Sequence, residues 1–225
     1  MTGSSPWSSP ETVAGFAQSG PNAVLMRFSE EVQRRTAGRL LLDIGCGAAR
    51  NAVPLAEQGW RVVGIDTSIP MLTAAVARAR AQGVATRSLF AAGAMDALPL
   101  ASASADVIVA HGIWNLATSG AQFRRAVGEA ARVAKPGAAI FVFTFSRHTL
   151  PPSARPEDGE DVVFTQFSGR PQVFLTAAQL ADEMTRAGFL PDPAVPLTEY
   201  NRPAPGALRT GSAPVIYEAA YRFRG

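Results

Sequence analysis

The chain contains very little of several features that mark particular classes of protein. Cys46 is its only cysteine in 225 residues, so the sequence offers neither an internal disulfide nor a cysteine-rich metal site. No apolar run approaches the length of a membrane span, and the first residues have neither the basic nor the apolar region of a signal peptide. We therefore expect a cytoplasmic protein in a reducing compartment, with no bound metal and no membrane partner.

Charge is also scarce. Charged residues make up 17% of the chain, the net charge is only +3, and Lys135 is the only basic residue that is not arginine. The basic residues are dispersed and form no cluster that could follow a nucleic-acid backbone, so we expect no nucleic-acid partner. A hydrophobic content of 47% over this length suits one domain with a sizeable core. The oligomeric state stays open.

One stretch near the start organises the chain. An apolar run over 40–44 is typical of a buried parallel strand, and Gly45-Cys46-Gly47 then turns the chain. A helix is expected over 49–58 and a second strand over 61–65. Asp66 follows that strand at its carboxyl end, where ligands bind in open parallel sheets. A carboxylate there can accept hydrogen bonds from both hydroxyls of a ribose.

Two classes of ligand fit a strand, a glycine turn and a downstream acid: dinucleotides and S-adenosylmethionine. A pyrophosphate site requires a third glycine, and Arg50 stands at that position. Asp43 lies directly before the turn, where a carboxylate would repel a pyrophosphate but suit a sulfonium and an ammonium. The turn therefore favours S-adenosylmethionine and leaves a nicotinamide-dependent oxidoreductase as the less favoured alternative.

The segments LLDIGCG and VVGIDTS resemble the first two motifs of the class I S-adenosylmethionine-dependent methyltransferases. The resemblance covers roughly residues 39–223. It implies an α/β fold: a doubly wound seven-stranded sheet, mostly parallel with an antiparallel last strand, and helices on both faces. It also implies S-adenosylmethionine as cofactor and transfer of a methyl group to a small-molecule acceptor by in-line displacement. A relative that binds the cofactor without methylating is the alternative, and the accepting atom stays open among oxygen, nitrogen, sulfur, carbon and a metalloid.

The resemblance also implies where the cofactor binds. Residues 92–100 look like the adenine-binding loop of the family, but Ala94 stands where the family has an acid. Asp96 or backbone groups are expected to replace that acid, unless Asp96 only caps the local turn. Cys46 is expected to fill space rather than act as a nucleophile. The expected cofactor-binding residues are Asp43, Gly45, Cys46, Gly47, Asn51, Asp66, Thr67, Ala94, Met95, Asp96 and His111.

Methyl transfer needs no obligatory catalytic side chain, because a base is required only when the nucleophile arrives protonated. His111, which follows the expected strand 105–110, is the candidate base, with a purely structural role as the alternative. The residues expected at the substrate are Trp7, Phe16, Trp114, His148, Tyr200 and Arg202. The alternative role of the aromatic residues among them is packing against the domain, and that of the polar ones is to fix a loop.

The sequence predicts a single methyltransferase domain over 1–225. Residues 1–38 would form a helical lid, mobile without ligand as far as about Gly20, and residues 39–146 the cofactor-binding half. Residues 147–225 would hold an insertion, a helix and the last two strands, with a short hairpin inside the insertion.

Overall fold

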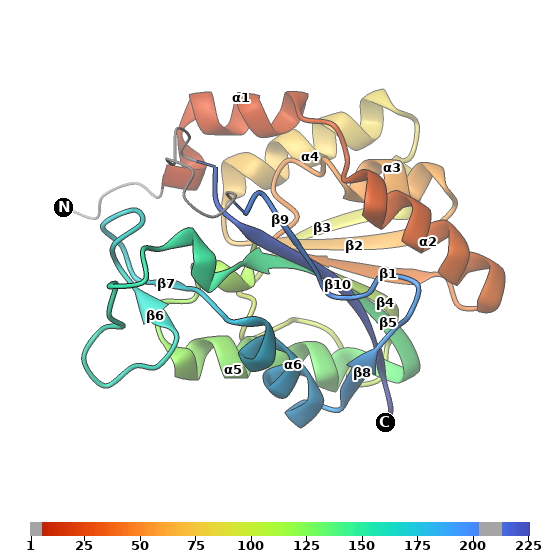
Figure 1. The fold of residues 1–225 in the computed structure, drawn as a ribbon. Coiled ribbons are helices and arrows are strands. Elements are labelled where there is room, and N and C mark those ends of the chain that lie inside the picture. The colour runs from red at the N-terminus through yellow and green to blue at the C-terminus, as the bar shows by residue number, and fades with distance from the viewer. Residues whose placement is uncertain (1–5, 203–212) are drawn as a thin grey trace.

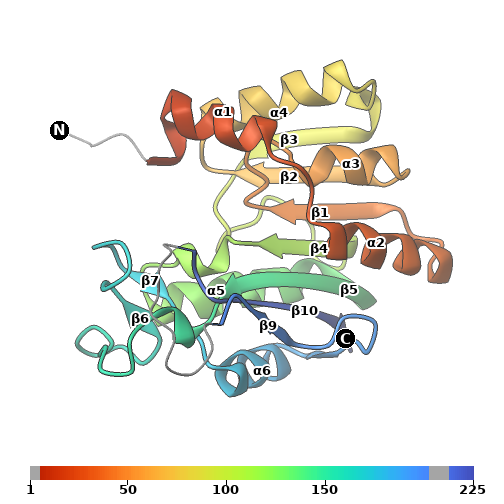
Figure 2. The same ribbon diagram turned by 45° about the horizontal axis from the view of Figure 1, so that its top comes forward.

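The computed structural model describes residues 6–202 and 213–225, and its central element is an eight-stranded sheet. The strand order is β3-β2-β1-β4-β5-β10-β8, with β9 beside β10 (Figure 2). Strands β1 to β5 are parallel, whereas β10 runs antiparallel to β5, β8 and β9. The strands are β1 (Leu40–Ile44), β2 (Arg61–Asp66), β3 (Ser88–Ala92), β4 (Ala105–His111), β5 (Ala134–Phe145), β8 (Phe189–Pro191), β9 (Thr198–Tyr200) and β10 (Ile216–Phe223). The predicted fold class is confirmed.

Helices cover both faces of the sheet (Figure 1). One face packs against α2, α3 and α4, and the other against α5 and α6, while α1 lies on α4. Serine, threonine or asparagine caps the N-terminus of all of these helices except α3 through a side-chain oxygen that accepts a backbone N–H of the first turn. The helices are α1 (Pro10–Gln18), α2 (Ala23–Arg35), α3 (Ala52–Glu57), α4 (Ile69–Ala81), α5 (Gly120–Val133) and α6 (Ala177–Arg186).

Short elements connect the sheet to its surroundings. Four single turns of 3₁₀ helix are η1 (Pro6–Ser8), η2 (Ala85–Arg87), η3 (Trp114–Leu116) and η4 (Arg147–Thr149). The insertion after β5 contains an antiparallel pair, β6 (Val163–Phe164) and β7 (Gln172–Val173), which confirms the predicted hairpin. This hairpin projects beyond the sheet at the left of Figure 1.

Two element boundaries and one strand differ from the sequence-based expectation. The helix after the glycine turn begins at Ala52 rather than at residue 49, because the turn continues through Ala49, whose φ is 60°. The sequence predicts a third strand over 86–91, but the strand begins at Ser88, since 85–87 coil into η2. A third C-terminal strand, β8, was not expected; its three residues are too few for their hydrophobic pattern to reveal a strand.

The helix α2 is held to the sheet by aromatic packing. Phe28 is buried at the centre of α2, and its ring lies 6.1 Å from that of Phe141 on β5. Leu25 and Val32 are buried on the same helical face. This packing of α2 on β5 fixes the N-terminus of α2 next to the carboxyl ends of the central strands.

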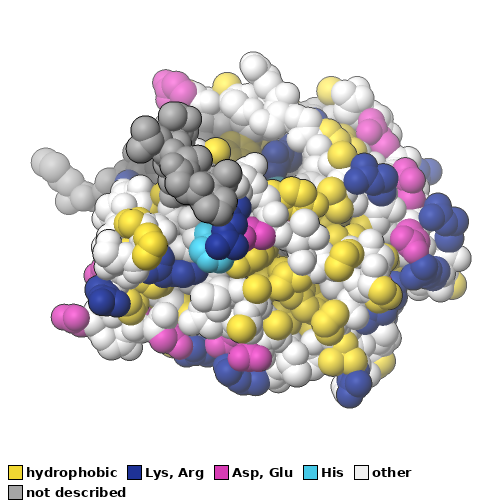
Figure 3. Space-filling model, in the orientation of Figure 1, with side chains coloured by type: hydrophobic (Ala, Val, Ile, Leu, Met, Phe, Trp, Pro, Cys, Tyr) yellow, Lys and Arg dark blue, Asp and Glu magenta, His cyan; other side chains and the backbone are white. Residues whose placement is uncertain are grey.

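The surface has a mixed character. On the face shown in Figure 3, arginine and acidic side chains are dispersed among apolar ones, with no extended basic tract. Within the described ranges, no helix is both long and apolar enough to cross a membrane.

We predict that Phe28→Ala lowers the free energy of unfolding by about 3–5 kcal/mol, because it empties a fully packed site between α2 and β5. Urea denaturation followed by circular dichroism measures the change. Leu197→Ala is the control, since that side chain is 37% exposed and its removal leaves little cavity. An equal loss of unfolding free energy in the two variants would show that the packing of Phe28 on Phe141 is not important for stability.

Candidate cofactor and substrate site

The carboxyl ends of β1, β2 and β4 meet at one edge of the sheet and open into two adjoining cavities of about 220 and 750 Å³. This is the edge at which open α/β sheets bind ligands. The cavities share part of their wall, so they form one two-part site. The shared lining residues are Trp7, Gly45, Asp66, Thr67, Ile113 and Leu116.

Asp66 holds the glycine turn in place. Its Oδ2 accepts the backbone N–H of Gly47 at 2.9 Å, and its Oδ1 accepts that of Ser68 at 2.8 Å. Each carboxylate oxygen has a further lone pair, and Asp66 lines both cavities. The same side chain can therefore fix the turn and bind hydroxyl groups of a ligand.

The two glycines of the turn serve different purposes. Both have positive φ, 69° at Gly45 and 53° at Gly47. A Cβ on Gly45 would lie 2.6 Å from the side chain of Ile113, so this glycine is needed for packing. A Cβ on Gly47 would meet nothing closer than Phe16 at 3.7 Å and would project into the larger cavity. Gly47 therefore keeps open a space that a ligand can use.

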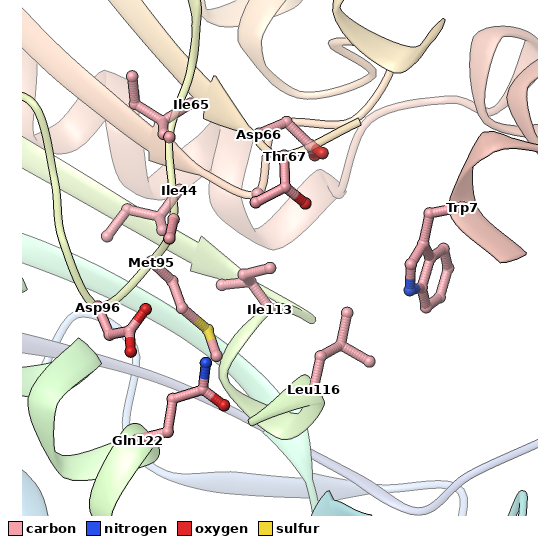
Figure 4. A pocket seen from close by; sticks show the side chains of 13 residues that line it. Trp7, Ile44, Ile65, Asp66, Thr67, Met95, Asp96, Ile113, Leu116 and Gln122 are labelled. Atoms are coloured by element: carbon pink, nitrogen blue, oxygen red, sulfur yellow. The ribbon is translucent and has the colours of Figure 1, made fainter. Parts of the chain in front are cut away.

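The smaller cavity is a slot with both apolar and polar side chains in its lining (Figure 4). Trp7 lies across it from Met95 and Asp96. Ala94 lines it where the resembled family has an acid, and the Asp96 carboxylate lies 3.3 Å from Arg125. Gln122, from the first turn of α5, adds an amide group that the sequence analysis missed. Apolar walls with Asp66 at one end suit a flat heterocycle attached to a ribose.

Three expected cofactor-binding residues lie behind the cavity wall instead of lining it. Asp43 is buried beneath the turn; burial raises its pKa to about 7, Arg50 opposes that rise and Asp66 adds to it. Burial also raises the pKa of the Cys46 thiol well above its usual value, which agrees with a space-filling role. Asn51 is buried and accepts the backbone N–H of Asn22 at 3.0 Å, so it joins two helices. The structure thus places these three side chains behind the wall, and their direct contact with the cofactor stays a prediction.

His111 lines the larger cavity but is a poor candidate for a base. Its ring stacks on Phe143 at 4.2 Å, and its Nδ1 lies 3.2 Å from Nη2 of Arg50. Burial and the positive charge of Arg50 together lower its pKa to about 3. The imidazole is therefore neutral at pH 7 and has little tendency to accept a proton, so the expected catalytic role is not supported.

A buried polar cluster supports His111 from behind. The Asn22 Nδ2 lies 3.2 Å from the His111 Nε2 and also donates to Glu218 Oε1 at 2.5 Å. The Asn22 Oδ1 accepts the backbone N–H of Leu25 and so caps α2. One asparagine thus ties the start of α2 to the ends of β4 and β10. The sequence analysis missed Glu218, although a carboxylate in an otherwise apolar strand is a usable signal.

The expected substrate residues divide into two groups. Trp7 and Phe16 line the larger cavity and contact each other edge to face, with ring centroids 6.0 Å apart. Trp114 does not line either cavity, because it is fully buried and packs on Phe123, which agrees with the packing alternative. The remaining three residues line neither of the two cavities and gather around β9, so their contact with a substrate stays a prediction. There the Glu199 carboxylate binds both His148, at 2.7 Å, and Arg202, at 3.3 Å, next to the exposed Tyr200.

The far wall of the larger cavity comes from β5 and the β6–β7 hairpin. Phe167, from the turn of the hairpin, lines this wall. Asn115 was missed; its side chain is buried, and its Oδ1 has no hydrogen-bond partner in the described part of the chain. Other lining residues of this wall are Phe143, Phe145, Ser168, Arg170, Pro171 and Gln172.

Comparison with known proteins agrees with this geometry. Residues 42–142 match the family model described as a methyltransferase domain. A Mycolicibacterium smegmatis protein named as a probable S-adenosylmethionine-dependent methyltransferase is 34% identical over 187 residues, covering 82% of this chain and 65% of that protein. The chain thus spans just under two thirds of the length of that relative. A demethylmenaquinone methyltransferase of Mycobacterium tuberculosis is 28% identical, covering 76% of this chain and 74% of its own.

The fold is shared with solved methyltransferase structures. One is a Burkholderia thailandensis 1,6-didemethyltoxoflavin-N1-methyltransferase with bound 1,6-didemethyltoxoflavin and S-adenosylhomocysteine. It is 20% identical with a TM-score of 0.65, covering 90% of this chain and 79% of that one. The family-model match, the relatives and the common fold support the resemblance to the class I S-adenosylmethionine-dependent methyltransferases.

Proposed function

We propose that the chain transfers a methyl group from S-adenosylmethionine to a small molecule. The observation that carries this proposal is the position of Asp66 and the glycine turn at the junction of the two cavities. Asp66 would accept hydrogen bonds from the ribose hydroxyls, and the smaller cavity would hold the adenine. The methionine portion would lie along Gly47, which leaves the far end of the larger cavity for the acceptor.

The bound cofactor would supply a methyl group on a sulfonium, which a lone pair of the acceptor takes while the carbon–sulfur bond breaks and its electrons stay on sulfur. The chain would contribute orientation and exclusion of water, which in ideal intramolecular cases lower a barrier by about 7–11 kcal/mol. Trp7 and Phe16 would shield the site from one side and the β6–β7 hairpin from the other. With the pKa of His111 near 3, an acceptor proton would leave to water rather than to this side chain.

Several observations support a small-molecule acceptor. The larger cavity has the size of ordinary small-molecule pockets, and its wall is rich in aromatic side chains. The relatives named above act, by their names, on demethylmenaquinone and on a toxoflavin precursor. The dispersed basic residues and the buried free thiol fit our further proposal of a cytoplasmic protein without a nucleic-acid partner.

Two alternatives can be separated by experiment. A non-methylating relative would bind S-adenosylhomocysteine in calorimetry but give no methylated product by mass spectrometry across a broad panel of acceptors. A nicotinamide-dependent enzyme would be stabilised by a dinucleotide and not by S-adenosylhomocysteine, and Arg50 in place of a third glycine argues against it. A folded sample that binds no S-adenosylhomocysteine at millimolar concentration would contradict the proposed function.

We predict that Asp66→Ala weakens binding of S-adenosylhomocysteine by about 1.5–3 kcal/mol, roughly ten- to a hundred-fold in Kd. The variant removes the proposed ribose acceptor and the bond to the Gly47 amide. Asp66→Asn keeps one acceptor oxygen and should lose less. Calorimetry on samples with native circular dichroism makes the measurement, and an unchanged Kd in Asp66→Ala would rule out this role.

We predict that Gly47→Ala abolishes binding of S-adenosylhomocysteine while the protein still folds. The added methyl group has only ordinary contacts in the cavity, but it takes the space proposed for the methionine portion. Gly83→Ala is the matched control: its φ is 70°, nothing lies near its Cβ, and it carries the same backbone strain of about 1–2 kcal/mol. Binding that survives in Gly47→Ala would place the ligand elsewhere.

We predict that the N-terminal segment exchanges amide hydrogens readily without ligand and is protected by S-adenosylhomocysteine. The helix α1 buries no residue fully, and Arg78 holds it through the carbonyls of Ala17 and Ser19. Arg78→Ala should therefore raise the Kd, whereas Arg80→Ala, an exposed neighbour on α4, should not.

Hydrogen exchange of peptides spanning Trp7 to Phe16, with and without the ligand, is the direct measurement. Identical protection in the two states would show that this segment is ordinary surface packing and not a lid. The part of the predicted lid at residues 1–5 lies outside the described residues.

A further inference from the structure

Among the residues that the structure describes, the acceptor end of the larger cavity combines aromatic rings with the positive charge of Arg170. Two rings come from β5, as Phe143 and Phe145, which are two residues apart and so lie on one face of the strand. A third, Phe167, comes from the turn between β6 and β7. Phe143 stacks on His111 with its ring centroid 4.2 Å away, so one side of this end is a flat, rigid wall.

The ring of Phe167 is placed against the site and not in the core. It contacts Phe145 edge to face at 5.6 Å and Phe174 at 5.8 Å, yet Phe167 is still 37% exposed. Its neighbours Phe164 and Phe174 are buried in the small core of the insertion. An aromatic side chain that stays exposed beside a cavity offers its surface to a ligand. The three rings thus suit a planar aromatic guest.

Arg170 provides the charge. It lies in the same turn as Phe167, lines the cavity, and has no hydrogen bond or ion pair with any residue that the structure describes. Two other arginines near the insertion are engaged: Arg124 binds Asp161 and Glu183, and Arg147 binds backbone carbonyls. Arg155 is exposed and, like Arg170, has no side-chain partner among the described residues, but it lines neither cavity. A guanidinium without a carboxylate partner, at the edge of an apolar pocket, is suited to an anionic ligand.

The other cation of the cavity, Arg50, is already in use. It lies at the glycine turn, its Nη2 is 3.2 Å from His111, and the buried Asp43 attracts its charge. It therefore belongs to the cofactor side. Of the described residues that line the larger cavity, Asp66 alone is a carboxylate, and it also lies on that side. Within the described lining, the far end is consequently positive without an acidic counterpart.

We propose that the acceptor is a planar aromatic molecule with an anionic substituent, packed against the rings of Phe145 and Phe167 with its anion at Arg170. This inference rests on the proposed methyltransferase function, because it assigns the far end of the cavity to the acceptor.

The test uses a matched pair of probes that differ only in charge. The probes are naphthalene-2-carboxylate and naphthalene-2-carboxamide, titrated calorimetrically into the full chain saturated with S-adenosylhomocysteine. The carboxylate should bind about 3- to 10-fold more tightly than the amide, the range for a partly exposed ion pair. Cyclohexanecarboxylate, which has the charge without the flat ring, should bind at least as weakly as the amide.

Variants test which residues cause the tighter binding of the carboxylate probe. Arg170→Gln should bring the carboxylate-to-amide ratio close to one while leaving the affinity for the amide unchanged. Phe167→Ala should weaken both naphthalene probes alike. The matched control is Arg155→Gln, an exposed arginine of the same insertion that lines neither cavity, and it should keep the full ratio. Arg50→Gln should change the Kd of S-adenosylhomocysteine and leave the ratio intact.

The outcomes separate this inference from the proposed function. Failure to bind S-adenosylhomocysteine would contradict the methyltransferase proposal itself. If S-adenosylhomocysteine binds, but the two naphthalene probes bind equally or not at all, the acceptor class is wrong while the function stands. A carboxylate preference that persists in Arg170→Gln would overturn the role of that residue.

Discussion

The hydrogen bond from the Gly47 amide to the Asp66 carboxylate is the contact on which the site depends. It joins the turn after β1 to the end of β2, and the second oxygen of Asp66 starts α4 through the Ser68 amide. Because a charged acceptor binds both amides, the bonds are stronger than ordinary backbone ones. The two glycines then keep positive φ, and the space above Gly47 stays free. The geometry that we assign to cofactor binding is thus a by-product of how one carboxylate satisfies two backbone donors.

A second buried cluster links parts of the chain that are far apart in sequence. Asn22 caps α2 and contacts both His111 and Glu218, while Asn51 binds its backbone. A polar group of this cluster that lost its partner away from water would cost free energy. Because a shift of α2, β4 or β10 would break these contacts, the cluster fixes the relative positions of the three elements. It also decides the chemistry of His111. The histidine is half-buried next to Arg50 and stacked on Phe143, so it shapes the wall of the cavity, and its lowered pKa favours the neutral imidazole near neutral pH.

The larger cavity is assembled from three separate regions. The glycine turn and β4 form its base, the η1–α1 segment covers one side, and the β6–β7 hairpin closes the far end. Only the base is shared with the motifs by which the family is recognised. The hairpin, which carries Phe167 and Arg170, lies in the insertion after β5, and loops at that edge of a sheet commonly carry specificity. We therefore assign the base of the cavity to the proposed cofactor and the hairpin to the proposed acceptor.

The sequence by itself determined the alternation of strands and helices, the glycine turn, the position of Asp66 and the hairpin in the insertion. These are local features: apolar runs, caps and turn glycines act over a few residues and can be read in order. Only the tertiary structure decided which polar and aromatic side chains face the site. Trp114 and Asn115 are adjacent, yet one is core and the other lines the cavity. His148, Tyr200 and Arg202 gather around Glu199 because β9 pairs with β10, and Asp43 and Cys46 lie beneath the turn and not above it. Such outcomes depend on packing between distant elements, and no short stretch of sequence contains that information.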